Sequence, residues 1–136
     1  MTDPDFLDLD DVLDIHDRQL ARFGGATGVR DQNLLESALA TPRATFGGDF
    51  VHEDLFAMAA AYAFHIAQNQ PFMDANKRTG LVAALAFLKI NGYTVPDPSE
   101  RLYEGMIAVA ERRLDKEGLA AMLREMSRPI PGGAAE

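Results

Sequence analysis

Two stretches of this sequence are apolar almost without interruption, and a short polar segment joins them. Residues 55–68 read LFAMAAAYAFHIAQ and residues 79–92 read TGLVAALAFLKING, with NQPFMDANKR between them. A helix that is apolar on all sides must be buried, so this pair of helices is expected at the centre of a small bundle. The polar segment is then held against the core at both ends. Such a segment is a place where a rigid site can be built.

Helical periodicity runs through most of the remaining chain. Apolar residues at three- and four-residue spacing predict a helix over about residues 8–22, ended by Gly24 and Gly25. Asp31 is expected to cap a helix that stops near Pro42. Two more helices are expected near residues 99–113 and 115–127, and residues 93–95 are expected to form a short extended segment. The sequence therefore predicts an all-α, compact single-domain bundle of about six helices over residues 1–128, with a flap-like loop over 41–54 and a loose tail over 129–136.

Composition narrows the possible functions. The chain has 136 residues, enough for one domain with its own core. A net charge of −8 argues against direct, non-specific binding of nucleic acid through its phosphates. The absence of cysteine excludes disulfides and thiolate metal sites. No apolar run reaches the length of a membrane span, and the acidic start lacks the basic residues of a signal peptide. We therefore expect a cytoplasmic protein without a membrane partner.

The polar segment carries the residues with the clearest chemistry. Pro71 disfavours continuation of the preceding helix, and the next helix is expected to begin near Asn76. Backbone N–H groups at a helix start favour anions, whereas Lys77 and Arg78 are cations placed in that same first turn. Binding phosphate would explain such a placement, and Asp74 beside it could hold Mg²⁺. From the residues alone, a nucleotide-phosphate cradle and a capped, solvated turn both remain open.

A family resemblance covers roughly residues 7–95. The segment IHDRQLARFGGATGVRDQNLLESALATPRATFGG and the motif after it resemble the Fic/Doc family, whose core motif begins with His-Pro-Phe or His-x-Phe. Lys77 stands where AMP-transferring Fic enzymes typically carry Gly, and their second Arg is missing from the segment after Arg78. Both features are similar to those of the death-on-curing (Doc) branch. The motif positions that match in register are Pro71, Phe72, Asp74, Ala75, Asn76, Lys77 and Arg78.

The resemblance implies a function and a set of roles. Doc-type toxins are protein kinases that use ATP to phosphorylate a threonine of elongation factor Tu, which arrests translation, and an antitoxin of the prevent-host-death type neutralises them. By position, Asp74 would bind Mg²⁺, and Asn76, Lys77 and Arg78 would hold the nucleotide phosphates. The loop over residues 41–54 would be the flap that aligns the target.

One position departs from the family pattern. Gln70 stands where the family carries its general-base histidine. A carboxamide does not titrate near neutral pH, so this chain is expected to be catalytically dead or impaired. His65 is interpreted as structural, and His16 and His52 as structural or solvated; none of the three is expected to substitute for the base.

Several alternatives stay open at this point. The second alternative is an enzyme that transfers a nucleotidyl (AMP) group to a protein hydroxyl, although Lys77 argues against this activity. The third alternative is a non-catalytic module that binds a protein in the former active-site groove, and the replacement of the histidine by Gln70 supports it. Gln70 itself is either a change introduced to disarm an active toxin or a natural loss, and the intact remainder of the motif favours the first.

Overall fold

The computed structural model describes residues 3–97 and 99–132. It confirms the all-α prediction, because six helices form the domain and the strands are only two residues long. Among the described residues, none of these helices is both long and apolar enough to cross a bilayer. The helices are α1 (Leu9–Phe23), α2 (Gln32–Ala40), α3 (Leu55–Asn69), α4 (Asn76–Ile90), α5 (Arg101–Ala110) and α6 (Lys116–Met126).

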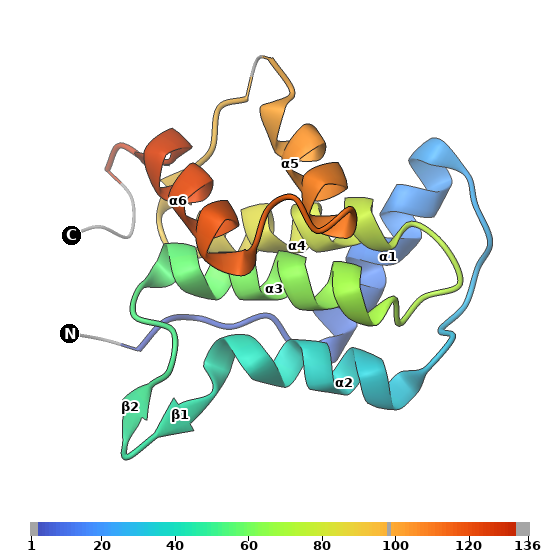
Figure 1. Ribbon diagram of the computed structural model, residues 1–136, viewed down its shortest axis with the longest axis horizontal. Helices are drawn as coiled ribbons and strands as arrows, with labels where there is room; N and C mark the ends of the chain where they lie inside the picture. Colours follow the sequence, from blue (N-terminus) through green and yellow to red (C-terminus); the bar gives the residue numbers. More distant parts are fainter. Residues whose placement is uncertain (1–2, 98, 133–136) are drawn as a thin grey trace.

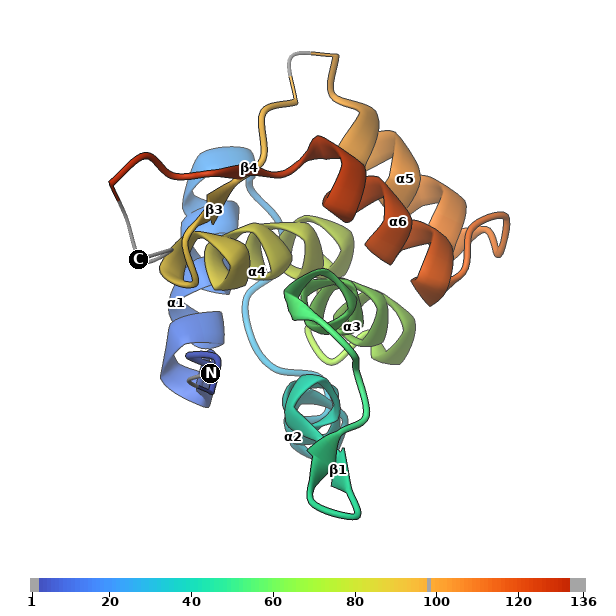
Figure 2. The ribbon, with the colours of Figure 1, turned by 90° about the vertical axis from the view of Figure 1, so that its left-hand side faces the viewer.

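The two predicted apolar helices lie at the centre of the bundle. Helices α3 and α4 run side by side in opposite directions, with α1 against α4, α2 against α3, and α5 and α6 on the opposite face (Figures 1 and 2). The two helices approach closely at Gly80 of α4, where an added Cβ would lie 2.9 Å from the backbone oxygen of Ala63. Tyr62, Phe87 and Ile66 are among the fully buried side chains that fill the surrounding core.

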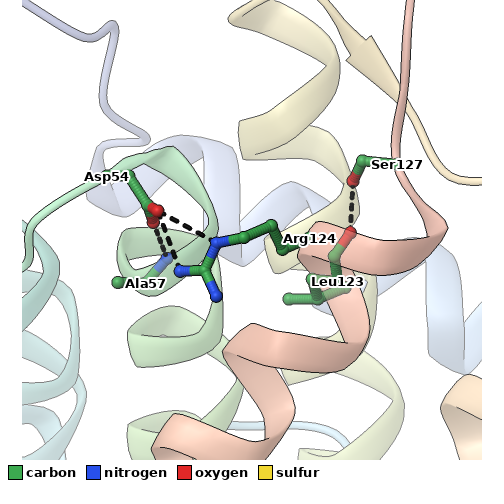
Figure 3. Close-up of polar contacts among 5 residues, drawn as sticks. All are labelled: Asp54, Ala57, Leu123, Arg124 and Ser127. Carbon is green, nitrogen blue, oxygen red and sulfur yellow. Dashed lines mark hydrogen bonds and ion pairs between the residues drawn. The ribbon is translucent and has the colours of Figure 1, made fainter.

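Aspartate side chains fix where most of the helices begin. Asp8, Asp31, Asp54 and Asp115 each accept a hydrogen bond from a backbone N–H in the first turn of α1, α2, α3 and α6, respectively. Each such cap satisfies a donor that the helix itself cannot pair. Asp54 also accepts hydrogen bonds at 2.8 and 3.1 Å from the guanidinium of Arg124, which ties the start of α3 to α6 (Figure 3).

Two small β-pairings complete the fold. The loop predicted as a flap contains a 3-10 turn (Thr41–Arg43) and a hairpin in which β1 (Thr45–Phe46) pairs with β2 (Asp49–Phe50). The second pairing joins β3 (Tyr93–Thr94) to β4 (Arg128–Pro129). The sequence places residue 129 onward in a loose tail, whereas Pro129 lies in β4 and Ile130 donates its backbone N–H to the Gly92 oxygen. Residues 133–136 of that tail lie outside the described residues.

Candidate active site

The polar loop between α3 and α4 is fixed by its own residues. Helix α3 ends because Gln70 adopts a left-handed conformation, with φ 49° and ψ 55°, while its N–H still bonds to the Ile66 oxygen at 3.1 Å. Phe72 is buried, and its ring stacks on His16 with centroids 3.8 Å apart. The side chain of Asn76 bonds to both the N–H and the oxygen of Phe72, at 3.0 and 3.1 Å. The loop is therefore anchored at its middle as well as at its ends.

A second loop, formed by residues 24–31 between α1 and α2, runs alongside the first. The Met73 N–H donates to the Gly28 oxygen at 3.0 Å, and Val29 forms an isolated bridge with Phe72. The Arg30 N–H donates to the Pro71 oxygen at 2.7 Å. We call residues 24–31 the clamp loop, because they bind the backbone on either side of Phe72.

Asp74 is held by backbone groups and is exposed to solvent. One carboxylate oxygen accepts from the Ala75 N–H at 2.9 Å and the other from the Ala26 N–H at 3.3 Å. These two bonds, to Ala75 first and then Ala26, lower the pKa of Asp74, and the nearby Arg78 adds to the effect. The clamp loop favours a glycine at position 25, because φ there is +128° and an added Cβ would also lie 2.9 Å from an Asp74 carboxylate oxygen.

His16 connects the first helix to the same residue. Its Nε2 lies 3.0 Å from the backbone oxygen of Asp74, and since a carbonyl only accepts, the Nε2–H must donate. His16 is itself almost fully buried. The structural interpretation of His16 thus holds in a more specific form: the ring supports both Phe72 and the backbone of Asp74.

The first turn of α4 has no side-chain acceptor. Its N-cap, Ala75, makes no capping bond, whereas α5, whose N-cap Glu100 also makes none, has its first N–H groups bonded to Asp97. Among the described helices, α4 is therefore alone in offering an uncapped N-terminal turn, and Lys77 and Arg78 lie in it. The Nε of Arg78 is buried without a partner, and its guanidinium carbon lies 5.0 Å from the centre of the Phe23 ring. A positive helix end of this kind favours an anion.

The predicted site residues meet in one cavity of about 250 Å³. Besides the loop and the first turn of α4, its lining comes from the end of α3 and from α5. A larger cleft of about 640 Å³ adjoins it through the shared residues Arg78 and Tyr103. The smaller cavity is lined by Ala67, Gln70, Met73, Asp74, Ala75, Asn76, Lys77, Arg78, Tyr103 and Ala110.

The remaining predicted features lie away from this cavity. Figure 1 places the hairpin of the flap-like loop beside the start of α3, whereas Gln70 follows its end, and a 15-residue helix is ~22 Å long. Among the described residues, no hydrogen bond or aromatic contact joins this hairpin to a residue that lines the cavity. His65 and His52 instead lie 3.3 and 3.2 Å from the Lys116 Nζ on α6, in keeping with a structural role.

Sequence reasoning missed the clamp loop as part of the site. Gly25, Ala26 and Arg30 all belong to the segment that carries the family resemblance, but their roles depend on contacts with residues 39 or more positions away. The only available signal was the resemblance itself, which gave these residues no function.

Comparison with known proteins decides the family. The Fic/DOC family model matches residues 6–88, more than half of the sequence. This chain belongs to the Fic/DOC family. It is 38% identical over 121 residues to the Toxin Doc of Mycolicibacterium smegmatis, a match that covers 88% of this chain and 91% of the relative. It is 32% identical over 117 residues to the Protein kinase doc of Escherichia phage P1, covering 86% and 91%. Within the Fic/DOC family, the chain is a Doc toxin homologue.

Proposed function

We propose that this chain is the toxin of a toxin–antitoxin pair, built to transfer phosphate from ATP to a threonine of elongation factor Tu. We further propose that Gln70 leaves it without the general base that the transfer needs. The observation that carries the proposal is the meeting of Gln70, Asp74, Lys77 and Arg78 in one cavity. The names of the two relatives, a toxin and a protein kinase, agree with it.

The residues present fit a magnesium-bound nucleotide. Asp74 is exposed, its pKa is lowered, and each of its oxygens keeps a lone pair beyond the one used by a backbone N–H. Among the described residues no group of three or more His, Cys, Asp or Glu side chains could hold a metal ion. This suits Mg²⁺, which usually takes one or two carboxylates and completes its shell with phosphate oxygens and water.

The first turn of α4 would hold the phosphates. Its uncapped N–H groups, the Lys77 ammonium and the Arg78 guanidinium all bear positive charge. Asn76 already uses its oxygen and one amide hydrogen on Phe72, so only its second amide hydrogen remains for phosphate. When bound, Mg²⁺–ATP would supply the phosphoryl group and partly neutralise its charge, leaving the protein to position the reactants.

Position 70 would then decide activity. Its side chain is exposed at the cavity, where a histidine could accept the proton of a target hydroxyl. The glutamine can orient that hydroxyl by hydrogen bonding but cannot take its proton near neutral pH. The left-handed backbone at position 70 is one that histidine adopts more readily than most residues, so a substitution should not disturb the fold.

Restoring the base is the decisive experiment. Gln70→His should raise transfer to elongation factor Tu by about 10²- to 10⁴-fold and arrest growth in cells without an antitoxin. Gln70→Asn is the matched control, because it suits the same backbone and has no titratable group. Asp74→Ala in the Gln70→His background should restore growth, since the metal would lose its carboxylate. Circular dichroism of each variant confirms that a loss of activity is not a loss of fold.

The mass added to the target separates the competing functions. A phosphate supports the kinase, whereas a nucleotide monophosphate would replace it with the AMP-transferring reaction. If folded Gln70→His protein binds Mg²⁺–ATP and modifies nothing, the kinase proposal fails and a non-catalytic binding module takes its place.

A further inference from the structure

Arg30 binds three consecutive carbonyl groups at the end of α3. Its Nε donates to the Gln70 oxygen at 2.7 Å, and its Nη2 donates to the Asn69 oxygen at 2.9 Å. Its backbone N–H donates to the Pro71 oxygen at 2.7 Å. A single residue of the clamp loop therefore fixes the backbone before, at and after the position of the missing base.

These carbonyl groups need an external partner. The last oxygens of a helix have no N–H ahead of them, and Pro71 has no N–H to offer. Gln70 is also one of four non-glycine residues with positive φ among the described residues, and such a conformation persists only where its surroundings determine it. A guanidinium suits this task because its planar fork donates two charge-assisted bonds in a fixed geometry.

We propose that Arg30 is a positioning residue: it holds position 70 in the left-handed conformation and so aims the side chain there into the cavity with Asp74. Arg30 lines no part of that cavity and acts only through the backbone of the loop. The catalytic meaning of this role rests on the proposed function, whereas the conformational role does not.

The first test needs no activity. The Cα, Cβ and carbonyl ¹³C shifts of Gln70 report its φ and ψ, and they should indicate the left-handed region in the native chain. Arg30→Lys keeps the positive charge but loses the planar guanidinium. The Gln70 shifts should therefore move toward the values of a residue that samples several backbone conformations, and they should move further in Arg30→Ala. Arg18→Lys is the matched control, since Arg18 is exposed and pairs with Asp14 on its own helix. Unchanged Gln70 shifts in both Arg30 variants would overturn the proposal. Because Arg30 is exposed, both variants are expected to fold.

The second test uses the Gln70→His background. Misplacing a reacting group by about 1 Å can cost ~10²-fold in rate, so Arg30→Lys should lower kcat by about that factor. The KM for ATP should stay the same, because the phosphate-binding residues lie on α4. If kcat/KM falls by the same factor because the KM for ATP rises, Arg30 would take part in nucleotide binding and the positioning role would be refuted. If Gln70→His transfers nothing even with Arg30 intact, the proposed function fails while the shift measurement still decides the role of Arg30.

Discussion

Replacing Gly80 with alanine tests the close backbone contact between α3 and α4. The added Cβ would lie 2.9 Å from the Ala63 oxygen and 3.4 Å from its Cα, and because both are backbone atoms the two central helices must move apart. Alanine favours a helix over glycine by ~1 kcal/mol, whereas overpacking a core typically costs ~1–3 kcal/mol. Because backbone atoms cannot turn aside, the overpacking cost should lie in the upper part of that range, at ~2–3 kcal/mol. After the ~1 kcal/mol gain in helix propensity is subtracted, we expect Gly80→Ala to lower the free energy of unfolding by about 1–2 kcal/mol.

A second buried helical glycine supplies the control. At Gly105 an added Cβ would lie 3.3 Å from Cε and Sδ of Met122, the flexible end of a side chain that can turn aside. Gly105→Ala should therefore be neutral or stabilise the protein by up to about 1 kcal/mol. Guanidinium and thermal unfolding measure both, with roughly 3–5 °C expected per kcal/mol for a chain of this size. If the Gly80→Ala protein were as stable as the native one, the claim that the α3 backbone leaves no room for a Cβ at position 80 would be refuted.

Two further outcomes follow from buried polar groups. Burial first, and the Lys116 ammonium second, lower the pKa of His52 and bring that of His65 to about 4. Folding thus favours the neutral form of both rings. The stability that this gives is complete above the unfolded value near pH 6.5 and, for His65, is lost as the pH falls toward 4. Unfolding at several pH values should show a loss of about 2 kcal/mol or more, shallower in Lys116→Met, whereas equal stability at pH 7 and pH 5 would contradict the prediction. The buried Tyr62 hydroxyl accepts a hydrogen bond from the Leu7 N–H at 2.9 Å. Tyr62→Phe should therefore lower the free energy of unfolding in guanidinium by ~1–3 kcal/mol. A change below the measurement error would mean that water replaces the hydroxyl.

The helices could be predicted from the sequence because their signals are local. Asp31 as an N-cap, Gly24 at a helix end and the two apolar runs fix the helix boundaries within a few residues. The expected helix over 99–113 begins at Arg101 and ends at Ala110, since Asp97 caps its first turn from outside and Arg112 takes a positive φ. Boundaries set by neighbours in sequence are thus the ones that a reader of the sequence can place.

Non-local contacts account for what the sequence did not predict. The pairing of β3 with β4 joins segments more than thirty residues apart, and strands of two residues have no detectable periodicity. The support that His16 gives to Asp74 spans 58 positions, and the contact between His52 and Lys116 spans 64. Local spacing carries no information about such partners, so the motif residues could be chosen in advance but not the residues that hold them.

The way position 70 is built also bears on how this protein can evolve. The fold holds its backbone through carbonyl groups and leaves its side chain exposed, so folding should not distinguish glutamine from histidine. An inactive chain should be as stable as an active one and as resistant to cellular proteases, which remove unstable proteins. Codons for glutamine and histidine differ only in their third base. On the proposed function, loss and recovery of activity at this position would therefore be single-nucleotide steps, with selection acting on activity and not on stability.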